Sequence, residues 1–310
     1  MEEGTDPPAP ARPGAPEADR RLGRKYPVLR HGYVVLVDYM GNDAAIVQAA
    51  RVSYGAGTKS LRDDRGLIRY LLRHGHTTPF EMVEFKFQVR LPIYVARQMV
   101  RHRTASINEY SARYSVVPDE FDLPEAEEVR RQSVRNRQGG AEPLPAVEAE
   151  AFRTDLARGC REAYAAYERA LAAGVARETA RLLLPLAYYT EWYWKINLHN
   201  LFHFLALRLD PHAQEEIRRY AVELARAAQA VCPVAYTAFE EFLLDGIRFS
   251  RREQMALRGL LDGAGPEEAL AAAGLPLRTE DGRPLRSGEG VEFLEKLDRI
   301  RRVTADRQSV

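Results

Sequence analysis

Three arginines and several hydroxyl and amide side chains fall within one short polar stretch, residues 101–115. Arg101, Arg103 and Arg113 carry planar guanidinium groups, which bind phosphate or carboxylate through paired hydrogen bonds. The other polar groups of the stretch include Ser106, Asn108, Ser111 and Ser115, and Glu109 is its only acid. Burying so many polar groups is costly unless an anionic, hydrogen-bonding ligand satisfies them. The stretch therefore predicts a site for an anion.

The charge of the whole chain gives no reason to expect binding to nucleic acid or to an anionic membrane. The 310 residues include 45 basic and 44 acidic ones, a formal net charge of +1. Residues 97–113, in contrast, hold four arginines against one glutamate, a local charge of +3 (four minus one) with histidine neutral. The anion site is therefore expected to be local. With 45% hydrophobic residues, the chain can bury a sizeable core in one large domain or two modest ones.

The cysteines and the apolar pattern indicate a soluble, cytoplasmic protein. Cys160 and Cys232 are far apart and lack C-x-x-C spacing, so neither a disulfide framework nor a zinc ribbon is supported. No charged-then-apolar leader follows Met1, and no run of about eighteen apolar residues occurs. We therefore expect no membrane partner.

A strand and a helix are predicted immediately before the polar stretch. Residues 83–91 alternate apolar and polar side chains, as a strand with one buried face does. Pro92 suits the start of a helix whose apolar stripe consists of Ile93, Ala96, Met99 and Val100. This helix would deliver the polar stretch and place Gln98 on its polar flank, one turn before Arg101.

The remaining elements are predicted from periodicity and from capping residues. Residues 32–40 are predicted as a strand, and helices are predicted over 44–52, 61–74, 149–172, 176–184, 187–208, 211–230 and 235–244. Asn42 or Asp43 is expected to cap the first helix. Residues 1–26 are predicted as a disordered arm, 27–249 as the catalytic domain with a long excursion at 117–148, and 250–310 as a helical extension of unassigned role.

The polar stretch resembles a known family. Its pattern Arg-His-Arg-x-x-Ser-x-Asn-x-x-Ser-x-Arg matches every fixed position in the signature of the flavin-dependent thymidylate synthases, and the resemblance runs from about Gly32 to about Phe239. It implies an α+β fold with helices around a central mixed or antiparallel sheet, and a homotetramer with shared active sites. It also implies reductive methylation of dUMP to dTMP, with 5,10-methylenetetrahydrofolate as carbon donor and NADPH-reduced FAD as hydride donor.

The resemblance also assigns site residues. For dUMP it implies Gln98, Arg101, Glu109, Ser111, Arg113, Arg181 (in an R-x-x-L-P segment) and Arg208. For FAD it implies Ser53, His76, Thr78, Arg101, His102, Arg103, Glu109, Asn197, His199 and His203. Arg208 is the expected catalytic residue, because a guanidinium near N3 and O4 of uracil favours ring deprotonation and activates the ring without a nucleophilic cysteine.

Two other functions stay open on the residues alone. His199 and His203 share a helix face at a spacing that suits a metal-dependent hydrolase, although Asn200 stands where the zinc-protease pattern has Glu. The basic stretch would also suit a nucleic-acid-binding protein with steep salt dependence, but only Tyr110 and Tyr114 offer stacking there. Neither a complete phosphate loop nor G-x-G-x-x-G occurs, so a Rossmann mode of flavin binding is not expected.

Overall fold

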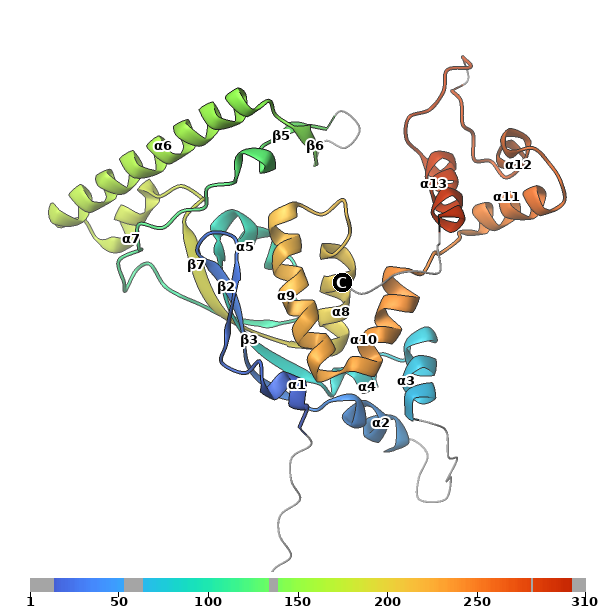
Figure 1. Ribbon diagram of the computed structural model, residues 1–310, viewed down its shortest axis with the longest axis horizontal. Coiled ribbons are helices and arrows are strands. Elements are labelled where there is room, and N and C mark those ends of the chain that lie inside the picture. The colour runs from blue at the N-terminus through green and yellow to red at the C-terminus, as the bar shows by residue number, and fades with distance from the viewer. Residues whose placement is uncertain (1–13, 53–63, 134–138, 280, 303–310) are drawn as a thin grey trace, which may run out of the picture. The chain divides into compact units, whose positions relative to one another are not determined.

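The computed structural model describes residues 14–52, 64–133, 139–279 and 281–302. The chain forms two compact units (Figure 1). The first comprises residues up to 132 and residues 138–244; the second comprises the short segment 133–137 and the residues from 245 onward. No helix in the described part of the chain is long and apolar enough to span a bilayer.

A five-stranded antiparallel sheet with the strand order β1-β2-β3-β7-β4 forms the centre of the first unit. Its strands are β1 (Lys25–Val28), β2 (Gly32–Met40), β3 (Glu84–Pro92), β7 (Tyr189–Asn197) and β4 (Ser106–Glu109). The first half of the polar stretch thus supplies an edge strand, β4, which pairs with β7. Helices packed around an antiparallel sheet confirm the expected α+β class.

The two predicted strands are present as β2 and β3, and the burial of alternate side chains in β3 shows that helices cover one face of the sheet. Phe85, Phe87 and Val89 of β3 are at most 1% exposed, whereas Lys86 between them is exposed. The alternation therefore buries one face of β3 against helices, since successive side chains of a strand point to opposite faces. Among the helices, α9 (Glu215–Val231) carries the buried Tyr220, whose hydroxyl donates to the backbone oxygen of Arg90 at 2.8 Å.

Seven of the described helices in the first unit pack against this sheet or against one another, and α8, α9 and α10 gather on one side of the sheet (Figure 1). They are α2 (Asp43–Val52), α3 (Asp64–Arg73), α4 (Thr78–Glu81), α5 (Ile93–Met99), α8 (Leu198–Arg208), α9 (Glu215–Val231) and α10 (Pro233–Phe239), which η3 (Glu240–Leu244) continues. In α5 the buried stripe is Val95, Ala96 and Met99; Val100, expected to be buried, is 38% exposed.

The two candidate capping residues serve two different helices. Asn42 Oδ1 accepts a hydrogen bond from the backbone nitrogen of Ala44 at 2.9 Å and so caps α2. The Asp43 carboxylate instead accepts from the backbone nitrogens of Val234 and Ala235, both at 2.9 Å, at the start of α10. Burial raises the pKa of Asp43, and these two hydrogen bonds oppose that rise. Asp43 therefore connects α2 to α10 across the core.

The prediction of a disordered arm through residue 26 was wrong for residues 14–26. This segment forms α1 (Pro16–Asp19) and the beginning of β1. Ala18 is fully buried, Tyr39 of β2 donates to Asp19, and its hydroxyl accepts from the backbone nitrogen of Ala15 at 2.7 Å. The polar composition suggested disorder, but burial and hydrogen bonds against β2 offset the entropy cost of ordering. Residues 1–13 lie outside the described residues.

The single helix predicted at 187–208 was also wrong: it is β7 followed by α8. Trp192, Trp194 and Ile196 are at most 2% exposed, whereas Tyr193 is 43% exposed, which is the period of two expected for a strand. β7 pairs with β3 along its whole length, and this pairing outweighs local helix preference. The next helix, α9, starts at Glu215 and not at residue 211.

The excursion at 117–148 and the residues after it contain short elements and one long helix. These are η1 (Ala126–Glu128), β5 (Arg130–Gln132), β6 (Gly140–Pro143), α6 (Ala146–Ala172), α7 (Arg177–Ala180) and η2 (Arg181–Leu183). β5 and β6 pair as an antiparallel ribbon. The predicted helix at 149–172 is confirmed by α6, and Gly174, with a positive φ of 83°, ends it.

The second unit contains α11 (Arg251–Leu261), α12 (Pro266–Ala272) and α13 (Glu289–Arg301). Its small core includes the fully buried Phe293. Glu253, 5% exposed, accepts from Lys296 at 2.6 Å. Burial opposes the charge on Glu253, but hydrogen bonds from Lys296 and Ser250 lower its pKa overall. The extension predicted as helical thus folds around its own core.

Candidate functional site

The polar stretch lies largely at the surface of the single chain. All four residues of β4 are exposed, as are Arg101, Arg103 and Arg113. Water satisfies exposed polar groups, so the cost of burying them arises only when a ligand or another chain covers the stretch. Within the described part of one chain, these side chains are therefore open to solvent.

The first pocket, of about 310 Å³, lies where the residues after α5 meet α8; we call it the Arg208 pocket. It is lined by Arg101, His102, Arg103, Thr104, Ile196, Asn200, His203, Leu207 and Arg208. Five of these are predicted site residues: Arg101, His102, Arg103, His203 and Arg208. The fold thus joins the start of the polar stretch to the helix that follows β7, nearly one hundred residues later.

The Arg208 pocket is strongly basic. Within the ranges that the structure describes, three guanidinium groups and no acidic side chain line it. Burial lowers the pKa of Arg208, and the nearby charge of Arg101 lowers it further. Among the described residues, the side chains of Arg101 and Arg103 have no hydrogen-bond or ion-pair partner. Free guanidinium groups without a protein counter-charge suit a ligand that brings negative charge of its own.

A hydrogen bond connects two of the predicted site residues. Arg208 Nε donates to His102 Nε2 at 3.2 Å. The His102 ring makes edge contacts with Phe204 and His203 of α8, with ring centroids 4.8 and 6.0 Å apart. Burial lowers the pKa of His102 to about 4, with further contributions from the positive charge of Arg208 and from His203. His102 is therefore neutral at physiological pH.

The second pocket, of about 470 Å³, lies at the other end of β4; we call it the Arg113 pocket. Its lining comprises Ile93, Glu109, Tyr110, Ser111, Ala112, Arg113, Val117, Arg181, Leu184, Tyr188, Tyr189 and Thr190. Four of these are predicted dUMP residues: Glu109, Ser111, Arg113 and Arg181. Arg113 Nε donates to Ser111 Oγ at 3.3 Å, and Arg181 Nε donates to the backbone oxygen of Glu178 at 3.2 Å.

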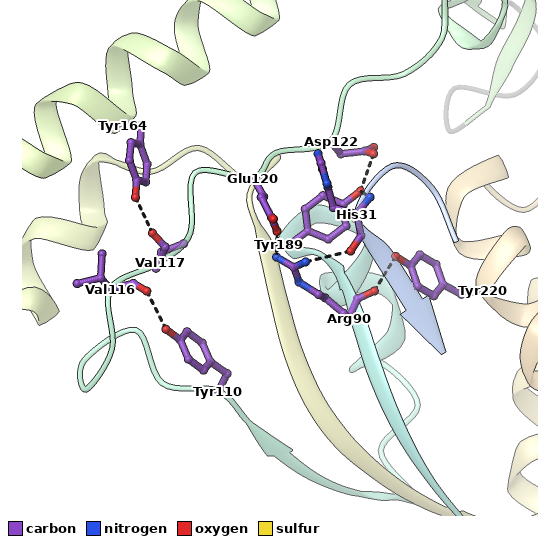
Figure 2. Close-up of polar contacts among 10 residues, drawn as sticks. All are labelled: His31, Arg90, Tyr110, Val116, Val117, Glu120, Asp122, Tyr164, Tyr189 and Tyr220. Atoms are coloured by element: carbon purple, nitrogen blue, oxygen red, sulfur yellow. Dashed lines mark hydrogen bonds and ion pairs between the residues drawn. The ribbon is translucent and has the colours of Figure 1, made fainter. Parts of the chain in front are cut away.

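Tyrosine hydroxyls hold the segment that forms one wall of the Arg113 pocket. Figure 2 shows the Tyr110 hydroxyl donating to the backbone oxygen of Val116, and Tyr164 donating to that of Val117, both at 3.0 Å. The Tyr167 hydroxyl accepts from the backbone nitrogen of Val117 at 3.2 Å. These bonds fix residues 110–117 against α6, so the wall of the pocket is anchored outside the sheet.

A buried carboxylate anchors the end of the same segment. Asp122 is 4% exposed and accepts hydrogen bonds from Tyr94 at 2.6 Å and from Tyr189 at 2.9 Å. Figure 2 shows the second of these bonds. The Tyr189 hydroxyl also accepts from the backbone nitrogen of His31 at 3.3 Å. Burial and the nearby Asp122 charge raise the pKa of Tyr189. Both carboxylate oxygens are satisfied, which is what a buried acid requires.

The two pockets are separate in one chain. Thr190 lines the Arg113 pocket and Ile196 lines the Arg208 pocket, and none of the lining residues is shared. Ile196 is six positions after Thr190, which corresponds to about 20 Å along β7. Six of the seven predicted dUMP residues thus fall into two groups, Arg101 with Arg208 in one pocket and Glu109, Ser111, Arg113 and Arg181 in the other.

Several predicted site residues do not line either pocket. Gln98 donates from Nε2 to Oε1 of Gln214, the N-cap of α9. Asn197 caps α8: its Oδ1 accepts from the backbone nitrogen and from Nδ2 of Asn200, both at 2.9 Å. Asn197 therefore orients Asn200, which does line the Arg208 pocket. Asn200 was missed, although its place three residues after a helix-capping Asn offered a signal.

His76, Thr78 and His199 also stand outside both linings. The His76 ring is nearly parallel to that of Tyr70, with centroids 6.0 Å apart, and Thr78 begins α4. Ser53 lies outside the described residues. Within those that are described, no group of three His, Cys, Asp or Glu side chains could hold a metal ion, so His199 and His203 have no third ligand there.

The residues at the start of β7 are the largest group that sequence reasoning missed. Tyr188, Tyr189 and Thr190 line the Arg113 pocket, and the Thr190 hydroxyl donates to Glu109 Oε1 at 2.6 Å. They were assigned to a helix, in which their side chains would have pointed in other directions. Large apolar side chains at every second position (Trp192, Trp194 and Ile196), with the charged Glu191 and Lys195 at alternate positions, were the signal that could have identified the strand.

Comparison with known proteins places this geometry in a family. Residues 35–234 match the family model described as thymidylate synthase complementing protein. A flavin-dependent thymidylate synthase of Thermus thermophilus is 57% identical over 249 residues, which cover 80% of this chain and 90% of that protein. The corresponding enzyme of Rickettsia conorii is 50% identical over 261 residues, covering 80% and 89%.

A solved structure is also similar. The UMP/dUMP methylase PolB from Streptomyces cacaoi, in a crystal structure with 5-Br dUMP, superposes with a TM-score of 0.64 at 36% identity. The match covers 71% of this chain and 99% of that one. The signature at residues 101–113, the α+β fold, the family model and the relatives agree, and the chain belongs to the flavin-dependent thymidylate synthases.

Proposed function

We propose that this chain converts dUMP to dTMP at a site built from the Arg208 pocket and the Arg113 pocket. The carbon donor is 5,10-methylenetetrahydrofolate, and FAD reduced by NADPH is the hydride donor. The observation that carries the assignment of residues is the Arg208 pocket itself, where Arg101, Arg103 and Arg208 meet without an acidic side chain. The substrate and cofactor are both phosphate esters, so both supply the missing negative charge.

The residues of the Arg208 pocket fit FAD. Arg101 and Arg103 have exposed, unpaired guanidinium groups within the described chain, and such groups bind the oxygens of a pyrophosphate through paired hydrogen bonds. His203 and Asn200 add neutral hydrogen-bonding groups along α8. Bound FAD supplies the hydride that completes the methyl group. The protein positions it and excludes competing reactions.

Arg208 is the proposed catalytic residue. Its guanidinium would donate hydrogen bonds at O4 and N3 of uracil and stabilise the negative charge that develops there, which makes C5 more nucleophilic. A covalent route through a thiolate is not suited to this chain. Cys160 and Cys232 are both buried, and burial raises the pKa of both thiols, so neither is an accessible thiolate at neutral pH.

The Arg113 pocket supplies the remaining groups for dUMP. Arg113 and Arg181 would bind the phosphate, with Ser111 as a neutral donor and Glu109 as an acceptor for a substrate N–H or O–H group. Since about 20 Å of β7 separates the two pockets, one mononucleotide would not reach both within one chain. We therefore propose a homotetramer in which the Arg208 pocket of one subunit faces the Arg113 pocket of another.

Exposed apolar side chains support assembly at this place. Leu182 and Leu186, which flank the Arg113 pocket on either side of Leu184, are 79% and 60% exposed. Tyr114, in the polar stretch, is 75% exposed. Apolar groups gathered beside a pocket are typical of a surface that another chain covers.

The two cysteines are unpaired, which supports the proposed cytoplasmic location.

The reaction is tested with the purified protein under anaerobic conditions. Flavin absorption bands should bleach on addition of NADPH, and dTMP should form when dUMP and methylenetetrahydrofolate are both present. Omission of either substrate is the control. A colourless protein that binds no added FAD would contradict the proposal.

Shared sites are tested by mixing inactive variants. Arg208→Ala disables one pocket and Arg113→Ala the other, so a mixed assembly should regain up to about a quarter of the wild-type sites if subunits combine at random. Arg208→Ala mixed with Arg101→Ala is the matched control, because both changes lie in the same pocket and no complete site can form. Equal activity of the two mixtures, with subunit exchange demonstrated, would count against shared sites.

A further inference from the structure

The hydrogen bond between Arg208 and His102 has only one possible direction. Arg208 Nε carries a hydrogen and has no lone pair to accept with, so it is the donor at 3.2 Å. His102 Nε2 must then be unprotonated, and the ring proton of the neutral imidazole is on Nδ1. A doubly protonated ring would present N–H against N–H and a positive charge against a guanidinium. The contact therefore requires the neutral ring.

The His102 ring is held from two sides. The backbone nitrogen of His102 donates to the backbone oxygen of Met99 at 3.1 Å, which fixes the residue just after α5. Its ring makes an edge contact with Phe204 of α8, with centroids 4.8 Å apart. Phe204 is fully buried and cannot move without disturbing the core. The acceptor that Arg208 meets is therefore fixed relative to the helix that carries Arg208.

This bond determines which nitrogens of Arg208 remain available. Nε is used by His102, and in the described part of the chain Nη1 and Nη2 have no partner. A guanidinium is planar, so fixing Nε limits the directions in which the two terminal nitrogens can point. Both belong to a side chain that lines the Arg208 pocket.

We propose that His102 is a positioning residue for Arg208: it accepts the Nε hydrogen bond and so directs both terminal nitrogens of the guanidinium toward the uracil of bound dUMP. This inference rests on the proposed function, because it assigns the substrate atoms that Arg208 meets. His102 contributes a lone pair and a fixed position. It contributes no proton to the reaction.

The other titratable groups near His102 act in the same direction. Arg208 and His203 face it from α8, and Arg101 adds its charge at Arg208. Arg208 and His203 both favour the neutral imidazole, because a positive charge beside the ring opposes its protonation. In the part of the chain that the structure describes, no acidic side chain lines the pocket to stabilise a protonated ring. His102 therefore remains an acceptor throughout the neutral range.

Three variants separate the acceptor from the ring. His102→Phe keeps an aromatic ring for the Phe204 contact but removes the acceptor. His102→Gln keeps an uncharged acceptor at about the reach of Nε2, whereas the amide of His102→Asn is too short and ends near Nδ1. With FAD-loaded protein, we expect kcat for dTMP formation to fall about tenfold to a hundredfold in the Phe and Asn variants, with KM for dUMP changed less. The Gln variant should remain within about threefold of wild type.

A double-mutant cycle tests whether His102 acts through Arg208. In an Arg208→Ala background, His102→Phe should cause no further loss of kcat, because there is no guanidinium left to position. An undiminished loss in that background would overturn the proposal and assign His102 a direct contact with cofactor or substrate. A Gln variant as slow as the Asn variant would also overturn it. If the Phe variant does not fold, the comparison of Gln with Asn still decides.

The hydrogen bond can be read without turnover. The chain has seven histidines, so 15N-histidine labelling can assign His102 by its loss in His102→Gln. We expect unprotonated Nε2 and protonated Nδ1 at pH 7, and a higher pKa for His102 in Arg208→Ala. His212→Gln is the control, since His212 is exposed and bonds to Asp210. A protein with this signature that forms no dTMP would contradict the proposed function and leave the hydrogen bond established; protonated Nε2 would overturn the positioning role.

Discussion

The hydroxyl of Thr190 donates a hydrogen bond to Oε1 of Glu109 at 2.6 Å, and so connects the start of β7 to the end of β4. Thr190 is 7% exposed, whereas Glu109 is exposed at the mouth of the Arg113 pocket. A buried donor thus fixes an exposed carboxylate. The bond leaves the other carboxylate oxygen of Glu109 free to accept from a ligand.

Replacing Thr190 with Val tests this relationship, because the two side chains have nearly the same shape. Without the hydroxyl, Glu109 samples more rotamers, and we expect KM for dUMP to rise about threefold to tenfold, which corresponds to the loss of one hydrogen bond of ordinary strength. Steady-state kinetics measures the change. Thr237→Val is the matched control: its hydroxyl bonds to Pro233 within α10, at an exposed position. An unchanged KM in Thr190→Val would show that this bond does not orient Glu109.

Asp122→Asn should destabilise the protein. An amide cannot accept from both Tyr94 and Tyr189 as the carboxylate does, so one buried hydroxyl loses its partner, at a cost of about 1–3 kcal/mol. Thermal unfolding measured by circular dichroism should show a lower Tm. Tyr110→Phe is the comparison, because its hydroxyl bond to Val116 is exposed and its loss should cost much less. Equal shifts in Tm would argue against a buried anchor at Asp122.

Asp43 and Asn42 offer a paired test of two caps. Asp43→Ala removes the acceptor for two backbone nitrogens of α10, whereas Asn42→Ala removes the acceptor for one nitrogen of α2. Loss of a cap costs about 0.5–2 kcal/mol, and we expect the Asp43 variant at or above the top of this range and the Asn42 variant near its bottom. Urea unfolding would report both values. The reverse order would be inconsistent with Asp43 connecting two helices.

His102 should make the protein acid-sensitive. Its pKa in the folded protein is about 4, below the ordinary value of 6.5. Between these values the unfolded chain binds the proton and the folded chain does not, so stability is fully present above pH 6.5 and decreases as the pH falls toward 4. Wild type should therefore lose more thermal stability than His102→Gln across this window. Parallel curves for the two proteins would contradict a lowered pKa at His102.

The family and the strands β2 and β3 could be predicted from the sequence, whereas β7 and the edge strand β4 could not. Strand β3 (Glu84–Pro92) could be predicted because its apolar side chains recur at intervals of two, and strand β2 (Gly32–Met40) because β-branched and aromatic residues are concentrated there; both signals are visible without a partner. The proposed assignment of Arg101, Arg113 and Arg208 to the site came from the resemblance and its signature. Their division between two pockets could not come from it, since that depends on where β4 pairs with β7.

β7 shows why local pattern was insufficient. Its aromatic-rich sequence runs directly into α8, and no Gly or Pro marks the boundary at Asn197. The strand is specified by pairing with β3, about one hundred residues earlier in the chain. The same holds for residues 14–26, whose order depends on contacts with β2. Pairing over such distances leaves little trace in a window of ten residues.

The strand order has a consequence for synthesis on the ribosome. Among the described strands β4 pairs only with β7, and 79 residues (from 110 to 188) lie between them. At about 5–20 residues per second, the signature segment emerges roughly 4–16 seconds before the strand that fixes it. During that interval the backbone N–H and C=O groups of β4 have no partner strand and are exposed to other molecules near the ribosome. The high charge and short length of this segment protect it from pairing with other chains, and nucleation of the site is necessarily a late event in folding.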